Sequence, residues 1–298
     1  MFMDIWNRCN KSKIYIQGFI LLLILVGEIG FTCYIPEWRN SFFSVMKDKH
    51  VEQFAGCMWV FAGLMAGLGF TMGIKLWLSQ LFSFEFRRGA SKLFLKKWVK
   101  GERSAPNYTQ AMTEAVRNST ELLVQVGVEV FISASAVVIL LGINHSNHKL
   151  IGAAIVYTLL TFVFTSRFNK PMVLADATWQ SSEGRYREAI SDIANGNGDY
   201  TVKDKFVALA TSYIHYTKTV MYFTLFSRLQ GSITHLAPYL LLSTDYFGGS
   251  MTFGEFMASV AVFELLVLNA TIILTVYPQI TRARASVKIM KEFYSDIQ

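Results

Sequence analysis

The fold is decided by the stretch Ile14–Tyr34, IYIQGFILLLILVGEIGFTCY, in which Glu28 is the only charged residue. A helix needs roughly 20 predominantly apolar residues to cross the hydrocarbon core of a bilayer, and this stretch has that length. Five further stretches have similar length and composition: Phe54–Ser79, Leu122–Ile143, Leu150–Phe168, Thr219–Leu242 and Phe256–Tyr277. The sequence therefore predicts an all-α integral membrane protein with six transmembrane helices.

The composition of the whole chain agrees with a lipid environment. Hydrophobic residues make up 52% of the 298 residues and charged residues only 16%, whereas roughly a quarter of an ordinary soluble domain is charged. A separate soluble domain takes about 100 residues or more, and six spans leave no room for one. We expect a single transmembrane domain over residues 1–298.

Positive charge is distributed unevenly between the predicted spans. Of the 28 Lys and Arg residues, 22 fall before the first span, between the second and third, between the fourth and fifth with the ends of these two spans included, or after the sixth. Because Lys and Arg near span ends are retained in the cytoplasm, both termini are predicted to be cytoplasmic. The longer segments, 80–121 and 169–218, then become cytoplasmic helical extensions. This bias explains the net charge of +7 without a nucleic-acid partner.

The sequence lacks the usual signatures of catalysis. No GxxxxGK[ST] motif is present, since Gly73-Ile74-Lys75 has neither its spacing nor its hydroxyl. Neither an HExxH motif nor a Ser/His/Asp constellation is found. Cys9, Cys33 and Cys57 have no metal-ligand spacing and are an odd number. We expect a protein that is not an enzyme and has no cofactor and no metal site.

Four acidic residues lie inside or at the edge of the apolar runs, and ionisable groups at membrane depth are usually functional. They are Glu28, Glu121, Glu129 and Glu264. A carboxyl group in this environment can take up and release protons, as a proton-coupled carrier requires. Alternatively, each acid is paired, for instance with Arg228 or Lys75, and only holds helices together.

Two predicted spans carry polar stripes. Glu121, Gln125 and Glu129 are spaced i, i+4, i+8, which keeps them on one helical face. Arg228, Ser232, His235 and Tyr239 form a comparable stripe on the fifth span. These stripes predict faces that line a wet cavity.

Other features predict the shape of the helices. From Phe54 to Lys100 no proline or polar turn interrupts the chain, which predicts one rod of about 70 Å. Pro106 and Asn107 supply a break. After Pro171 the arrangement recurs, with a helix through Trp179–Ile193, an elbow at Asn195–Gly198 and a return helix from about Asp204. Gly63 and Gly67 form a small-xxx-small pair typical of close helix packing, and Glu255 is expected to cap the sixth span.

A further set of motifs is spread along the chain. It consists of Glu28 with Gly30, Trp38 with Phe42, Arg87, Trp98, Asn107 with Gln110 and Glu114, and the segment Gln180-Ser-Ser-Glu183-Gly-Arg-Tyr186-Arg187. Together these residues resemble the SbmA/BacA family of bacterial inner-membrane peptide transporters, and the last segment fits that family's Gln-x-x-Glu-x-x-Tyr-Arg signature. The resemblance covers nearly the whole chain from about Trp6.

The resemblance implies more than the residues alone. It implies an ABC-exporter-like (type IV) transmembrane domain without a nucleotide-binding domain, assembled as a homodimer in the bacterial inner membrane. By this resemblance, alternating access driven by the proton gradient imports peptides or peptide-like antibiotics such as microcins, antimicrobial peptides and bleomycin-like compounds. The alternative is the transmembrane subunit of an ABC transporter whose ATPase is a separate chain.

Overall fold

The computed structural model describes residues 2–100, 115–144, 147–194 and 202–296, and every regular element in these ranges is a helix. The helices are α1 (Phe2–Arg8), α2 (Lys11–Asp48), α3 (Val51–Lys100), α4 (Val116–Ile143), α5 (His148–Ala194), α6 (Val202–Phe247) and α7 (Phe253–Asp296). The predicted all-α class is confirmed. Each predicted span lies within one helix from α2 to α7.

Five of the helices are long and apolar enough to cross a membrane. Within the described residues these are α2, α3, α4, α5 and α7. The polar stripe that includes Arg228 and His235 lowers the hydropathy of α6, which is not one of the five. The chain is thus a multi-pass membrane protein, while the number six stays a prediction.

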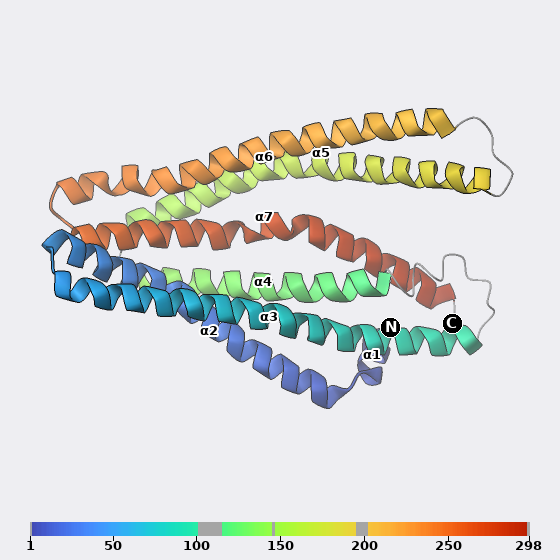
Figure 1. Ribbon diagram of the computed structural model, residues 1–298, viewed down its shortest axis with the longest axis horizontal. Coiled ribbons are helices and arrows are strands. Elements are labelled where there is room, and N and C mark those ends of the chain that lie inside the picture. The colour runs from blue at the N-terminus through green and yellow to red at the C-terminus, as the bar shows by residue number, and fades with distance from the viewer. Residues whose placement is uncertain (1, 101–114, 145–146, 195–201, 297–298) are drawn as a thin grey trace. The chain divides into compact units, whose positions relative to one another are not determined.

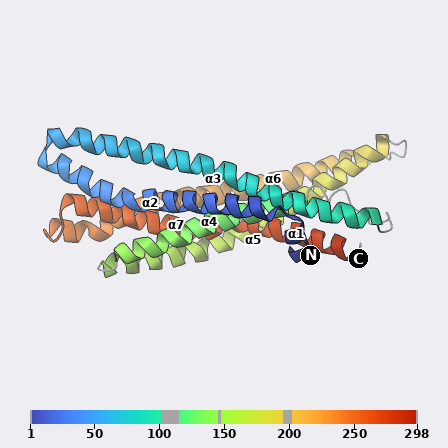
Figure 2. The same ribbon diagram turned by 90° about the horizontal axis from the view of Figure 1, so that it is seen from below.

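Local capping fixes where α2 begins and where it turns into α3. The Asn10 side chain accepts a hydrogen bond from the Lys13 amide at 3.3 Å, which caps the first turn of α2. At the other end Lys49 adopts a left-handed conformation with φ of 59°, and the His50 amide donates to the Val45 carbonyl at 3.1 Å. This is the hydrogen-bond pattern of a Schellman motif. Figure 2 shows α2 and α3 joined by this tight turn.

A reciprocal capping box starts α7. The Thr252 amide donates to Glu255 Oε2 at 2.7 Å, and the Glu255 amide donates to Thr252 Oγ1 at 3.2 Å. Just before it, Gly249 has a φ of +76°, a conformation that favours glycine. The predicted capping role of Glu255 is confirmed.

The predicted rod is present as α3, a continuous helix of 50 residues. Pro171 lies inside α5, which continues past it to Ala194, and α6 begins at Val202, two residues before the expected Asp204. The predicted break at Pro106 and the elbow at Asn195–Gly198 lie outside the described residues.

The chain divides into two compact units, Met1–Ala154 with Pro238–Gln298, and Ile155–Ala237. In the first unit α4 packs on α7, α2 on both α3 and α7, and α1 on α3 (Figure 1). The prediction of one transmembrane domain over the whole chain stays a prediction.

Two clusters of buried apolar residues hold the first unit together. One joins α1, α3, α4 and α7 and contains Ile5, Ala90, Leu93, Phe94, Ala115, Val116 and Met290. The other joins α2, α3 and α4 and contains Leu21, Leu25, Ile29, Leu78 and Ile132. Of the glycine pair on α3, Gly67 lies so close to the Phe31 ring that an added Cβ atom would overlap it. A Cβ atom added to Gly63 would meet nothing within 4 Å.

The second unit is an antiparallel pair formed by the larger parts of α5 and α6. Aromatic contacts run along its whole length in reversed order. Phe168 stacks on Phe226 with ring centroids 4.9 Å apart, Trp179 stacks on Tyr216 at 5.0 Å, and Tyr186 contacts Phe206 at 5.5 Å. Because the residue numbers of the contact partners increase along α5 as they decrease along α6, the two helices run in opposite directions.

Much of the outer surface is apolar. Phe19, Trp59, Phe70, Val138 and Leu159 are each more than half exposed. Large contiguous apolar surfaces are rare on soluble monomers and typical of surfaces that face lipid or a partner. The surface therefore agrees with the membrane class that the composition predicts.

Candidate functional site

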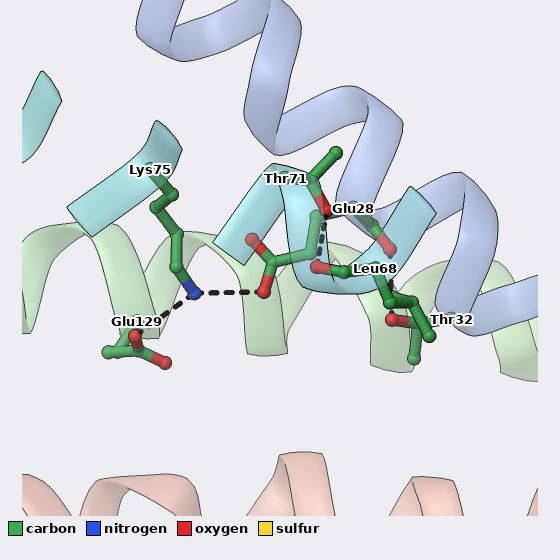
Figure 3. A network of polar contacts seen from close by, with 6 residues as sticks. All are labelled: Glu28, Thr32, Leu68, Thr71, Lys75 and Glu129. Atoms are coloured by element: carbon green, nitrogen blue, oxygen red, sulfur yellow. Dashed lines mark hydrogen bonds and ion pairs between the residues drawn. The ribbon is translucent and has the colours of Figure 1, made fainter. Parts of the chain in front are cut away.

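Three charged residues from three helices meet inside the first unit. Lys75 Nζ on α3 lies 2.8 Å from Glu28 Oε1 on α2 and 3.3 Å from Glu129 Oε1 on α4. Figure 3 shows the lysine reaching between the two carboxylates. We call Glu28, Lys75 and Glu129 the charged triad.

Apolar packing one turn away positions the triad. Leu25, Leu78 and Ile132 each lie three residues from a triad member, and all three belong to one buried cluster. Residues three apart lie on the same helical face, so this cluster sets the separation of the charged groups. Thr32 Oγ1 also donates to the Glu28 carbonyl at 2.9 Å (Figure 3).

Exposure differs within the triad. The Glu28 side chain is 5% exposed, that of Lys75 13% and that of Glu129 41%. With all three groups ionised, the triad has a net charge of −1. Glu28 Oε2 is buried, and no described residue forms a hydrogen bond with it. A buried oxygen without a partner is unfavourable, so the triad has one unused acceptor at its buried end.

A cleft of about 350 Å³ with a mixed polar and apolar lining opens at the exposed end of the triad. It is lined from three helices by Lys75, Leu76, Ser79, Gln125, Val128, Glu129, Ile272, Val276 and Gln279. Of the stripe predicted on α4, Gln125 and Glu129 line this cleft. Glu121 is half-buried on α4 and does not line this cleft.

Glu264, the fourth predicted acid, lies in a different place. Its Oε2 is 3.2 Å from Nη1 of Arg39 on α2, and the two side chains are 18% and 29% exposed. The pair joins α7 to α2. Beside it, Trp38 Nε1 donates to the Cys57 carbonyl at 2.9 Å and the Trp38 ring stacks on Phe42 at 5.0 Å. This end of α2 is held by both an ion pair and aromatic packing.

The polar stripe on α6 divides between the two units. Arg228, Ser232 and His235 line a hollow of about 480 Å³ on α6 within the second unit. Tyr239 belongs to the first unit, where its ring packs on Phe256 of α7 with centroids 5.7 Å apart.

The residues of the Gln-x-x-Glu-x-x-Tyr-Arg motif interact locally on α5. Gln180 Nε2 donates to Asp176 Oδ2 at 3.0 Å, and Arg187 Nε lies 3.2 Å from Glu183 Oε1, each one turn apart. Tyr186 packs against α6. Of these contacts, the one made by Tyr186 joins α5 to α6, and the other two lie within α5.

The remaining motif residues are less informative. Arg87 is half-buried on α3, and Trp98 lies on the same helix. Asn107, Gln110 and Glu114 lie outside the described residues.

Sequence reasoning named Lys75 only as one possible partner for the acids, and it did not single out Arg39. Arg39 lies between the first and second predicted spans, and it reaches Glu264 across 225 positions of sequence. The position of Lys75 within an apolar span indicates that it needs a charged partner. For Arg39, no local pattern reveals a partner so far along the chain.

Comparisons with known proteins agree with this architecture. The sequence model of the SbmA/BacA-like family matches residues 11–298. A protein of Escherichia coli (strain K12), described as inner membrane ABC transporter ATP-binding protein YddA, is 19% identical over 330 residues. That alignment covers 97% of this chain and 58% of the relative, so the chain spans little more than half the relative's length.

Proposed function

Because the chain belongs to the SbmA/BacA-like family and is a transmembrane transporter, we propose that it imports peptides or peptide-like antibiotics using a proton gradient. The compounds include microcins, antimicrobial peptides and bleomycin-like molecules. We place the transporter in the bacterial inner membrane, as a homodimer with both termini in the cytoplasm. Most Lys and Arg residues fall on the side that holds the termini, which supports this orientation.

The charged triad is the observation that carries the proposal. A proton-coupled carrier needs an ionisable group that water reaches and that is linked to helices able to move. Glu129 lines the cleft, and Lys75 ties it to α3 and α2. Differential proton binding to two conformations shifts the balance between them, and this network offers a route for that coupling.

In the proposed cycle the dimer opens alternately to the two sides of the membrane. The cleft beside the triad and the hollow on α6 carry polar groups at helix positions that lipid would disfavour. We propose that Arg228, His235, Gln125 and Tyr239 face the aqueous interior between the subunits. Glu264 and Glu121 are secondary candidates for proton coupling, and Glu264 already has Arg39 as its partner.

The direct test is uptake of a labelled proline-rich antimicrobial peptide into proteoliposomes that contain the purified chain. We expect uptake to rise when the outside is acidified relative to the lumen and to fall when a protonophore collapses the gradient. Glu129→Gln is expected to abolish the response to the gradient, because it removes the carboxyl group in the cleft.

Two controls make the test decisive. Liposomes without protein measure passive entry, and Lys149→Met removes an exposed lysine whose ion-pair partner, 3.0 Å away, is Asp245 and not a residue of the triad. Uptake that ignores the gradient and survives replacement of Glu28, Glu129 and Glu264 by Gln together would rule out proton coupling.

A second function is supported by the Escherichia coli relative, whose description includes ATP binding and whose length exceeds the matched part. In this alternative the chain is the transmembrane subunit of an ABC transporter with its ATPase on another chain. Purification from the native membrane in mild detergent discriminates between the two. A stoichiometric ATPase partner and ATP-dependent uptake would favour the alternative.

A further inference from the structure

We propose that Lys75 is the positioning residue of the transport cycle: it releases Glu129 when that carboxylate takes up a proton, and then pairs with Glu28 alone. This inference rests on the proposed proton-coupled function and assigns different roles to two of its acids. Glu129 exchanges the proton, whereas Glu28 stays ionised as the fixed partner of the lysine.

The asymmetry of the triad supports this division. The Lys75 ammonium is 0.5 Å closer to Glu28 than to Glu129, with distances of 2.8 Å and 3.3 Å. Glu129 is 41% exposed and lines the cleft, while Glu28 is 5% exposed and does not. A proton arriving through water therefore meets Glu129 first, and the weaker of the two ion pairs is the one it breaks.

Two carboxylates are the charged groups that face Lys75 among the described residues. From α2 it faces Glu28, and from α4 it faces Glu129. The described residues of α7 that line the cleft, Ile272, Val276 and Gln279, bear no charge. Among the described residues Lys75 forms ion pairs with these two carboxylates only, so two carboxylates and one ammonium set the charge balance on which the proposal rests.

The proton step is simple. A proton from water in the cleft binds a carboxylate oxygen of Glu129, and the triad changes from a net charge of −1 to neutral. Lys75 remains protonated and loses its electrostatic attraction to Glu129. Glu28 Oε2, which no described residue bonds, offers the ammonium a second acceptor, so Lys75 can use both oxygens of one carboxylate.

A change in helix contacts follows. In the unprotonated state Lys75 connects α3 to both α2 and α4. After protonation the charged link from α3 to α4 is lost and the link from α3 to α2 is strengthened. Loss of the proton reverses both changes. Through Lys75, the protonation of Glu129 thereby determines whether α3 is linked by ion pairs to both α2 and α4 or to α2 alone.

Two substitutions at the triad are expected to shift the pH profile of peptide uptake in opposite directions. Lys75→Met removes the ammonium that opposes protonation, so half-maximal uptake moves to higher pH by about one unit or more. Glu28→Gln leaves Lys75 with Glu129 as its only carboxylate, so half-maximal uptake moves to lower pH. Profiles are measured in proteoliposomes with the labelled proline-rich peptide, and each is normalised to its own maximum.

Controls separate this mechanism from a structural role. Lys75→Arg keeps the charge and is expected to restore a profile close to that of the wild type, and Lys149→Met tests the loss of an unrelated lysine. A misfolded carrier loses amplitude, whereas opposite shifts of the midpoint require the charge balance described above. Elution of each variant as a single species in gel filtration checks folding, and Glu28→Gln decides the matter if Lys75→Met does not fold.

The outcomes are distinguishable from those for the function itself. If wild-type uptake does not depend on pH, the proposed function fails and this inference with it. If wild-type uptake depends on pH but Lys75→Met and Glu28→Gln leave the midpoint unchanged, or shift it in the same direction, only the role of Lys75 is overturned.

Discussion

Arg39 and Glu264 show how a single pair of residues stabilises this protein. Their charged atoms are 3.2 Å apart, and both side chains are mostly buried between α2 and α7. Removing one partner of such a pair leaves the other charge poorly solvated, which costs more than the pair itself contributes. The pair therefore needs both members, whatever its net contribution to folding.

For this pair we predict that Glu264→Ala lowers the free energy of unfolding by about 2 kcal/mol, because the Arg39 charge that remains keeps some contact with solvent. The measurement is thermal unfolding of the purified protein in detergent. The swapped variant Arg39→Glu with Glu264→Arg is expected to recover a large part of the loss. A swap that is as unstable as two independent single changes would show that the ion pair is not the cause.

Cys9 allows a prediction about chemical reactivity. Its Sγ donates to the Ile5 carbonyl at 3.3 Å, and burial, followed by the nearby Glu85 carboxylate, raises the pKa of the thiol, while Lys92 lowers it. Only the thiolate reacts with maleimide. We expect labelling of Cys9 at pH 8 to be slower than that of a model peptide thiol, with Cys33 and Cys57 replaced by Ser. The two rates should converge as the pH rises, and equal rates at pH 8 would contradict the prediction.

For single residues, the sequence reveals which acidic side chains are candidates for function but not which basic side chains pair with them. Glu28, Glu129 and Glu264 are visible because each is a carboxylate among apolar neighbours. Their pairing depends on which faces of three helices meet, and Arg39 lies 225 positions from Glu264. Helical spacing relates residues within an element and carries no information about distances between elements.

Close approach between elements is clearest where α7 begins. A Cβ atom built on Gly254 would overlap the Ser44 hydroxyl and the backbone and side chain of Asn40 on α2. Because backbone atoms cannot move aside cheaply, only glycine allows α7 to pack this closely on α2.

We therefore predict that Gly254→Ala destabilises the protein by about 1–3 kcal/mol, the usual cost of overpacking, as measured by thermal unfolding in detergent. Gly152→Ala on α5 is the matched control, because its added Cβ meets nothing within 4 Å. That control is expected to be neutral or slightly stabilising. Equal effects of the two substitutions would contradict the close contact.

Elements were the most predictable level of this structure. Each apolar run lies within one helix because a span must satisfy its own backbone hydrogen bonds. The helix ends were less predictable, since α6 continues to Phe247, past the expected end at Leu242. Prolines were also tolerated, as Pro36, Pro171 and Pro238 lie inside helices. A proline removes only one backbone hydrogen bond from its helix, and all three helices continue past it.

For the whole molecule, the number of transmembrane spans determines on which sides of the membrane the two termini lie. Within the described residues five helices are long and apolar enough to cross a membrane, and α6, which carries Arg228 and His235, is not one of them. An odd number of spans places the termini on opposite sides of the membrane, whereas six place them together. Hydropathy undercounts a helix that faces water inside an assembly, which is the position proposed for α6.

We predict six spans with both termini in the cytoplasm. Green fluorescent protein fused before Met1 or after Gln298 is expected to fluoresce, and alkaline phosphatase inserted between Gly248 and Gly249 is expected to be active. Fluorescent protein folds in the cytoplasm and the phosphatase folds outside it, so the reporters are complementary. Fluorescence from only one terminus would show that an odd number of helices crosses the membrane.

The length of α3 has a mechanical consequence. Its 50 residues span about 75 Å, and Lys75, bound on either side by a carboxylate, lies midway between Val51 and Lys100. If α3 rotates as a rigid helix about Lys75, its two ends move in opposite directions. A rotation of only about 5° would displace each end by about 3 Å, so in the proposed transport cycle a small tilt there would narrow the route on one side of the membrane while widening it on the other.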